Sequence, residues 1–252
     1  MPLKLYKKFI VCILMSIVLS VAFFPVHSTA TEAMPFETHS PSIILMDAST
    51  GKILYEKDIY TRRYPASLTK VMTAIIVLEK AQLNDVATVS YGAVMDISSG
   101  YVTANLQVDE ELTVEQLLYL LMMASANDAA IVLAEHVSGS VEGFSALMNE
   151  KAKAIGCKDT NFVNPNGVHD ENHYSTAYDL ALIGKTAMKI DFFKKLVSAT
   201  SYKLSATNKY DKDDRYFTNS NHLLIPNSNE RPDNYYHRYA TGIKTGFTTP
   251  AR

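Results

Sequence analysis

The segment 67–82, SLTKVMTAIIVLEKAQ, has apolar residues at almost every position and contains neither glycine nor proline. A helix that is apolar on nearly all of its sides is a buried one, so this segment predicts a helix at the centre of a hydrophobic core. Pro65 stands just before it, as is common at the entry to a helix. Lys70 brings an amine into this segment close to its start.

Ser67 and Lys70 are three residues apart, so they share one face of the predicted helix. Ser67 would lie in the first turn, where the helix dipole favours an alkoxide. Burial lowers the pKa of a lysine, and the neutral amine can act as a base. The same spacing occurs at Ser49–Lys52, where a predicted turn explains it fully. The pair therefore predicts either a nucleophile with its base, or a capping serine beside an ordinary lysine.

Extended segments flank a helical middle. Residues 42–47 and 52–58 predict two strands around a turn. Four helices are expected from apolar periodicity and capping residues, at 113–124, 128–139, 140–156 and 175–189. Residues 199–207 and 239–248 again predict strands. This order predicts an α/β (α+β) fold with an antiparallel sheet built from both chain ends and a helical lobe inserted at about 96–195.

The N-terminus predicts a secretory signal peptide at 1–30, followed by a linker at 31–41 and a catalytic domain at 42–252. Lysines precede an apolar run from Phe9 to Phe24, and small residues at Ser28 and Ala30 have the spacing of a cleavage site. An uncleaved membrane anchor is the alternative. In both cases the rest of the chain would lie outside the cytoplasm, secreted to the cell wall or the outer face of the membrane.

The cysteine content excludes an internal disulfide, and the net charge argues against binding to nucleic acid. Cys12 falls in the signal segment, so the mature chain holds only Cys157 and has no internal disulfide. We expect Cys157 to be a packing residue. The formal net charge of −2 gives no basic field that would attract nucleic acid.

Two further motifs stand downstream. In MMASANDAA, Ser125 and Asn127 lie between two apolar helical runs; Asn127 could simply cap the second helix. In GIKTGFT, Lys244 and Thr245 precede Gly246 on a predicted strand. A surface lysine and a turn glycine are the alternative there. A glycine inside a strand often marks the close approach of a ligand's backbone.

Ser-x-x-Lys, Ser-x-Asn and Lys-Thr-Gly, in that order, are typical of the penicillin-binding and serine β-lactamase superfamily. From about Ser42 to its end the chain resembles serine-type D-Ala-D-Ala carboxypeptidases, the low-molecular-mass penicillin-binding proteins of bacterial cell walls. Ala126 fits them, since they usually have a small residue there. The resemblance is carried by ASLTKVMTA, SANDAAIVLAEHVSGS, MNEKAKAIGCKDTNFVNPNGV, HYSTAYDLALI and IKTGFT.

The resemblance implies a β-lactamase/transpeptidase-like fold and a set of catalytic residues. Ser67 would attack the carbonyl of the penultimate D-alanine in a peptidoglycan stem peptide and become acylated. Lys70 would accept its proton, and Ser125 with Lys244 would relay a proton to the departing D-alanine. β-Lactam antibiotics would be covalent inhibitors, because they present a similar amide to the same serine.

The resemblance also implies a set of substrate-binding residues. Asn127 would hold the substrate amide, while Lys244 and Thr245 would bind its terminal carboxylate, with Gly246 beside them. The backbone N–H groups of Ser67 and Phe247 would form an oxyanion hole. No cofactor is implied.

Three other patterns carry no predicted chemistry or only a minor role. GKT at 184–186 is not a phosphate-binding loop, because it lies inside a predicted helix and position 179 is Asp. His169 and His173 lie in a polar loop without the context of a metal site, so no metal is expected. We expect His173 to make a structural contact near the site. Asn221, in NSNHLL, could line the cleft.

A serine β-lactamase on the same fold is the second hypothesis. It needs a base for deacylation, as in the Glu-x-x-x-Asn loop of class A enzymes. That pattern is missing from the predicted lobe: Glu142, Glu150 and Glu171 are followed four residues later by Ala146, Ala154 and Ser175, and Glu230 with Asn234 lies beyond it.

The family normally continues past the third motif, whereas this chain ends at Arg252. Further strands, a closing helix and often a second domain with a membrane anchor would follow. We therefore expect a truncated chain, in contact with the membrane only through its signal segment or a missing anchor. An inactive penicillin-binding fragment is the third hypothesis.

Overall fold

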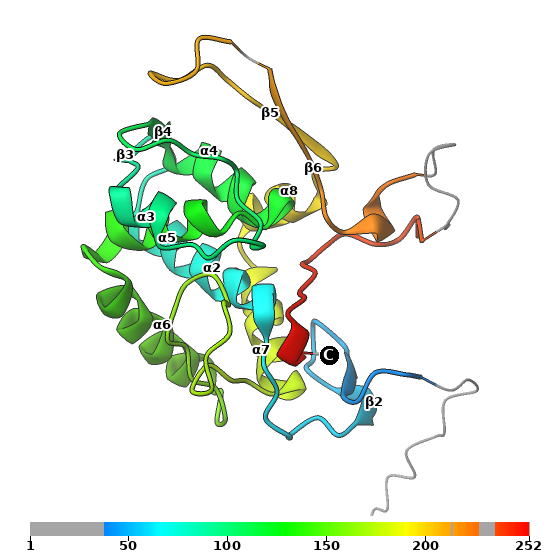
Figure 1. The fold of residues 1–252 in the computed structure, drawn as a ribbon. Helices are drawn as coiled ribbons and strands as arrows, with labels where there is room; N and C mark the ends of the chain where they lie inside the picture. The colour runs from blue at the N-terminus through cyan, green and yellow to red at the C-terminus, as the bar shows by residue number, and fades with distance from the viewer. Residues whose placement is uncertain (1–37, 213, 227–234, 252) are drawn as a thin grey trace, which may run out of the picture. The chain divides into compact units, whose positions relative to one another are not determined.

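The computed structural model describes residues 38–212, 214–226 and 235–251 (Figure 1). The predicted signal peptide and residues 31–37 of the predicted linker lie outside the described residues. Residues from His39 onward form a compact unit. Within the described ranges, no helix has both the length and the apolar character needed to cross a membrane.

The helix α2, Lys70–Lys80, is the centre of the hydrophobic core. It packs against α5 (Asn127–Ser138), α6 (Val141–Ile155) and α7 (Ala177–Ala187), which surround it in Figure 1. Its side chains are buried from Lys70 to Val77. The prediction of a central buried helix from its uniformly apolar sequence is confirmed.

The start of this helix differs from the prediction. Residues Ala66–Thr69 form a 3₁₀ turn, η1, so Ser67 precedes the α-helix and does not belong to it. The Leu68 N–H donates to the Pro65 carbonyl three residues earlier, and Ala66 has a φ of +49°. The chain therefore enters the α-helix through a tighter 3₁₀ turn, and the α-helical hydrogen bonding begins at Lys70.

Three of the other helices begin at residues whose capping chemistry is visible in the sequence. Thr113 and Gln116 form a capping box at α4, Val114–Tyr119, which continues into a π-helical turn, η2, Leu120–Ala124. Ser140 caps α6, and Thr176 caps α7. Two shorter helices are α3 (Tyr91–Met95) and α8 (Asp191–Ser198), and two 3₁₀ turns are η3 (His222–Leu224) and η4 (Thr249–Ala251).

The described strands form three antiparallel pairs: β1 (Ile43–Met46) with β2 (Ile53–Lys57), β3 (Val86–Thr88) with β4 (Glu111–Thr113), and β5 (Ser201–Leu204) with β6 (Arg215–Thr218). The mixed α/β class is confirmed. The single sheet expected from both chain ends is not found among these residues. The strand predicted at 239–248 is also wrong, since a strand requires a hydrogen-bonded neighbour and this segment pairs with none of the six strands.

The turn between β1 and β2 explains the second Ser-x-x-Lys spacing. Ser49 Oγ donates to Asp47 Oδ1 at 2.7 Å, and the Asp47 N–H donates to the Lys52 carbonyl at 2.9 Å. The Ser49 and Lys52 side chains therefore belong to a hairpin turn, as predicted.

The capping box at α4 gives a first test of the fold. The Gln116 N–H donates to Thr113 Oγ1 at 3.2 Å, and the Thr113 N–H donates to Gln116 Oε1 at 2.7 Å. Thr113→Ala removes the capping oxygen, so we expect the free energy of unfolding to fall by about 1 kcal/mol, measured by urea denaturation. Thr113→Ser keeps the hydroxyl and serves as control. Equal stability of the two variants would contradict this assignment of the helix start.

Candidate active site

Lys70 lies under the nucleophile candidate with its side chain fully buried, at 0% exposure. Its Nζ lies 3.1 Å from Ser67 Oγ, 2.8 Å from Asn127 Oδ1 and 2.6 Å from the Asn166 carbonyl oxygen. The three partners come from η1, from the first turn of α5 and from the loop after α6. The buried amine therefore joins three parts of the chain at one point.

The electrostatics at Lys70 favour the neutral amine. Desolvation by burial holds its pKa well below the usual value for a lysine; the nearby charge of Lys244 lowers it further, and Asp128 acts against both. Two of the three partners are carbonyl oxygens, which only accept hydrogen bonds. A neutral amine donates to these two and turns its lone pair to the Ser67 hydroxyl. This arrangement can remove the hydroxyl proton.

A close backbone contact positions the loop that supplies the third partner. Pro165 accepts a hydrogen bond from Thr73 Oγ1 on α2 at 2.6 Å, one residue before Asn166. Gly167 follows with a φ of +81°, and a Cβ at this position would collide with the carbonyl group of Ala66. The loop therefore rests directly on the backbone of Ala66, which precedes the nucleophile candidate Ser67. Sequence reasoning missed Asn166, because a backbone carbonyl carries no residue-type signal, although the NPNG turn marks the place.

His173 fastens the same loop to η1. Its side chain is buried; Nδ1 accepts a hydrogen bond from the Val163 N–H at 3.2 Å, and Nε2 lies 2.7 Å from Thr69 Oγ1. Since Nδ1 accepts, Nε2 carries the hydrogen and donates to Thr69. Burial lowers the pKa of His173 to about 4. The expected structural contact near the site is present.

Ser125 and Asn127 stand at the break between η2 and α5. Ser125 has left-handed geometry with a φ of +62°, which ends the π turn. Ala126 is the N-cap residue of α5, so the alternative that Asn127 caps the helix is wrong. The Asn127 amide instead accepts from Lys70 and donates from Nδ2 to the Val102 carbonyl at 2.9 Å. The Asn127 side chain therefore bonds to Lys70 and to Val102, and it does not cap its own helix.

The Lys-Thr-Gly segment passes beside η1. A Cβ at Gly246 would lie 3.1 Å from the Pro65 carbonyl oxygen and 3.3 Å from the Leu68 N. The backbone that approaches Gly246 closely in this structure is therefore that of residues 65–68. Thr245 Oγ1 lies 3.0 Å from Ser220 Oγ. Sequence reasoning missed Ser220. It pointed to Asn221, whose Oδ1 accepts from the Leu223 N–H and caps η3.

Lys244 is half-buried, and its Nζ donates to the Thr245 carbonyl at 3.0 Å. Desolvation lowers its pKa to about 8. At neutral pH it is therefore a cation in a poorly hydrated position, where an anionic partner is favoured.

One cavity of about 430 Å³ brings most of the predicted residues together. Four serines line it together with Asn127 and Gly246. Lys244 lines a separate, smaller cavity with Leu68 and Ile183. The lining residues of the larger one are Ser67, Ser99, Gly100, Tyr101, Val102, Ala124, Ser125, Asn127, Ser220, Thr245, Gly246, Phe247, Thr248 and Thr249.

Comparisons with known proteins find similar sequences in one family. The family model for D-alanyl-D-alanine carboxypeptidases matches residues 28–252. The D-alanyl-D-alanine carboxypeptidase DacF of Bacillus subtilis is 36% identical over 217 residues, which are 84% of this chain and 51% of DacF. The D-alanyl-D-alanine carboxypeptidase of Streptomyces sp. strain K15 is 36% identical over 80% of this chain and 69% of its own length. The chain thus spans about half the length of the Bacillus relative.

Solved structures show the same fold. A variant of the Streptomyces K15 DD-transpeptidase gives a TM-score of 0.77 at 29% identity, covering 85% of this chain and 83% of that chain. Penicillin-binding protein 5 from Haemophilus influenzae gives 0.69 at 32% identity, covering 76% and 55%. The expected β-lactamase/transpeptidase-like class is confirmed.

The contact between Gly167 and Ala66 generates a prediction about the nucleophile. Gly167→Ala places a methyl group against the Ala66 carbonyl, so η1 and Ser67 must shift. We expect acylation of Ser67 by a fluorescent penicillin to slow by about 10²-fold, since small misplacements of a reacting group cost about that much. Labelling followed by gel fluorescence against time measures it.

Gly139 provides the matched control. It has a similar φ of +79°, and a Cβ there meets nothing within 4 Å. Gly139→Ala introduces the same backbone strain without the collision, so labelling should keep the wild-type rate. Equal slowing in both variants would mean that strain alone is responsible and that the contact with Ala66 does not position Ser67.

Proposed function

Because the chain belongs to the D-alanyl-D-alanine carboxypeptidase family, we propose that it is a serine-type D-Ala-D-Ala carboxypeptidase that removes the terminal D-alanine from peptidoglycan stem peptides. The single observation that carries the proposal is the buried amine of Lys70, 3.1 Å from Ser67 Oγ, with its other two contacts on carbonyl oxygens. A lysine held in this way serves as a base at neutral pH.

In the proposed mechanism Ser67 Oγ attacks the carbonyl carbon of the penultimate D-alanine, and its proton passes to Lys70 Nζ. The backbone N–H groups of Ser67 and Phe247 stabilise the oxyanion. The C–N bond then breaks, and the leaving D-alanine amine takes a proton relayed through Ser125 and Lys244. The ester on Ser67 is finally hydrolysed by water, which releases the shortened peptide.

Substrate binding follows the charges of the site. The cation of Lys244 and the Thr245 hydroxyl bind the terminal carboxylate, and Gly246 lets the backbone approach. Asn127 orients the amide of the substrate while it holds Lys70. The partner is therefore a peptide with a free D-Ala-D-Ala carboxyl end, and β-lactams react as covalent inhibitors.

The cavity favours this function over a β-lactamase. Among the described residues that line the cavity, none is an Asp, Glu or His that could activate water for fast deacylation. An acyl-enzyme made from a β-lactam ring would therefore persist. The hydrolysis of a peptidyl ester would depend on Lys70 and its partners.

The domain boundaries and the location are part of the same proposal. We assign a signal peptide to 1–30, a catalytic domain to 42–252 and its helical lobe to about 96–195. Family members act on peptidoglycan, so the site would face the cell wall outside the cytoplasm.

Two substrates test the proposed activity. The chain is incubated with a fluorescent penicillin and with diacetyl-Lys-D-Ala-D-Ala; stable labelling with release of D-alanine is the expected result. Ser67→Ala should abolish labelling and lower D-alanine release by about 10³-fold or more. Ser49→Ala, which alters the serine of the hairpin turn with the same spacing to a lysine, should change neither. Rapid turnover of penicillin would instead indicate a β-lactamase, and absence of both reactions would contradict the proposal.

The two lysines predict the pH dependence of kcat/KM for the peptide. Acylation needs neutral Lys70, so kcat/KM rises with pH on the acidic side as this lysine, with its lowered pKa, loses its proton. Carboxylate binding needs charged Lys244, whose pKa is about 8, so kcat/KM falls as the pH passes about 8. The measurement is the initial rate of D-alanine release from pH 5 to 10.

Lys244→Arg is the control for the falling limb, because an arginine keeps its charge over this range. Its kcat/KM should stay level above pH 8, even if the absolute value is lower. A falling limb that persists unchanged would assign this titration to another group.

A further inference from the structure

One wall of the cavity is a segment without regular secondary structure, residues 99–106, which we call the wall segment. Ser99, Gly100, Tyr101 and Val102 line the cavity. The wall segment lies between α3 and β4 in the sequence, and its backbone makes no strand pairing. Its position must therefore be fixed by hydrogen bonds from other elements.

The first turn of α5 holds the wall segment on one side. The buried carboxylate of Asp128 accepts hydrogen bonds from the Ala104 N–H at 2.9 Å and the Leu106 N–H at 3.2 Å. The Asn127 N–H and Nδ2 both donate to the Val102 carbonyl, at 3.0 and 2.9 Å. These bonds connect the wall directly to the helix that carries Asn127.

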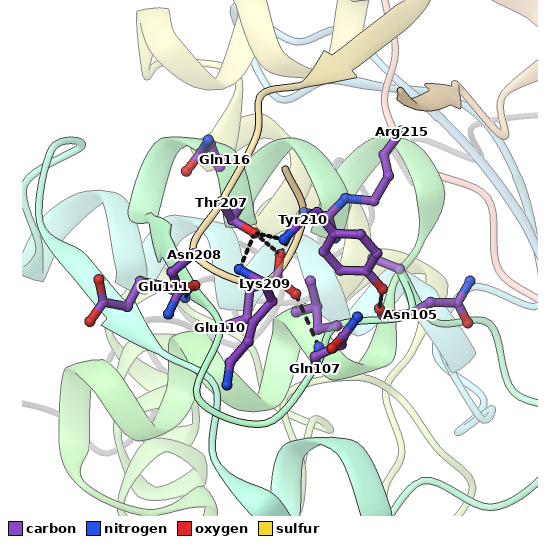
Figure 2. Close-up of polar contacts among 12 residues, drawn as sticks. Asn105, Gln107, Glu110, Glu111, Gln116, Thr207, Asn208, Lys209, Tyr210 and Arg215 are labelled. Carbon is purple, nitrogen blue, oxygen red and sulfur yellow. Dashed lines mark hydrogen bonds and ion pairs between the residues drawn. The ribbon is translucent and has the colours of Figure 1, made fainter. Parts of the chain in front are cut away.

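The tip of the β5–β6 hairpin makes a second set of hydrogen bonds to the chain between residues 105 and 111 (Figure 2). Tyr210 Oη donates to the Asn105 carbonyl at 2.8 Å, and Asn208 Nδ2 donates to the Asp109 carbonyl at 2.8 Å. Asn105 and Asp109 have φ values of +54° and +61°. A positive φ is sparsely populated in residues other than glycine. The hairpin tip bonds to the carbonyl of each of these two residues.

A buried ion pair fixes the hairpin tip itself. Glu110 is 0% exposed, and its Oε1 accepts from Arg215 Nη2 at 2.5 Å and from Thr207 Oγ1 at 2.9 Å. The Arg215 guanidinium stacks on the Tyr210 ring, 3.9 Å from its centroid. Figure 2 shows these side chains converging between the hairpin and the 105–111 segment. Moving the tip away would leave the Glu110 carboxylate buried without its cation, so the pair keeps Arg215 and Thr207 next to Glu110.

We propose that the hairpin tip, formed by Thr207, Asn208, Tyr210 and Arg215, is a positioning element for the active site, and that it holds the wall segment at the distance from Ser67 that substrate binding requires. This inference rests on the proposed function. The tip touches none of the reacting groups, so its effect is on the binding of the peptide and not on the bond-breaking step. Tyr210 is the positioning residue whose hydroxyl makes the direct contact with the wall segment.

Tyr210→Phe tests the inference with a minimal change. It removes the hydroxyl that holds Asn105 and keeps the ring on which Arg215 stacks. We expect KM for diacetyl-Lys-D-Ala-D-Ala to rise about three- to tenfold, the equivalent of one hydrogen bond, while kcat stays within about twofold. Amide hydrogen exchange, followed by mass spectrometry on peptides covering 98–106, should become several-fold faster. Asn208→Ala should shift both readouts in the same direction.

The same hairpin offers a matched control. Tyr216 is 70% exposed and lies on β6, so Tyr216→Phe removes a hydroxyl from the hairpin without touching the wall segment. It should leave KM and hydrogen exchange at wild-type values. Equal effects of Tyr210→Phe and Tyr216→Phe, or faster exchange with an unchanged KM, would overturn the positioning role.

The two proposals fail in different ways. A wild-type chain that neither binds penicillin nor releases D-alanine contradicts the proposed function, and with it any role of the tip in catalysis. An active wild-type chain with an unaltered Tyr210→Phe variant contradicts the positioning role alone. A fall in kcat with constant KM would move Tyr210 from substrate binding to the chemical step and would also overturn the inference.

Discussion

The burial of one amine organises this structure. Lys70 lies in the first turn of the helix at the centre of the core, where an unpaired polar group would be costly. Its three partners come from η1, α5 and the loop containing Asn166. These segments must therefore converge on the end of α2 for the core to form at all. The same convergence sets Ser67, the proposed nucleophile, beside Lys70, its proposed base, so folding of the core and assembly of the site are one event.

Convergence on a single atom requires backbone shapes that ordinary helices and strands do not supply. Ala66, just before the nucleophile, and Ser125, at the end of the π turn, both have positive φ. Such residues cost about 1–3 kcal/mol each and persist only where the surroundings determine them. Here Gly167 packs on Ala66, and the Asn127 side chain is held on both sides. The strained residues are thus Ala66, which precedes Ser67, and Ser125 itself. Both serines line the cavity.

Local patterns in the sequence predicted what local physics determines. The largely apolar run predicted the buried α2, and the capping residues Thr113 and Ser140 predicted two helix starts. Of the motif residues, Ser67, Ser125, Asn127, Thr245 and Gly246 line the cavity, whereas Lys70 is buried under Ser67 and Lys244 lines a separate cavity. Asn166 and Ser220 escaped prediction, because a backbone carbonyl and a loop hydroxyl gain their roles only from contacts across the fold. The strand expected at 239–248 failed for the same reason, since its pattern fits but strand geometry also depends on a neighbour.

Asn127 shows why one residue type is required where the amine and the cavity wall meet. Its Oδ1 accepts from Lys70 Nζ, and its Nδ2 donates to the Val102 carbonyl. An aspartate of the same shape could satisfy Lys70 but would oppose the carbonyl with a second acceptor, and its charge would raise the pKa of the amine. An asparagine places an acceptor and a donor on one rigid plane and leaves Lys70 able to stay neutral. The Asn127 amide therefore links Lys70, the proposed base, to the wall segment through a single side chain.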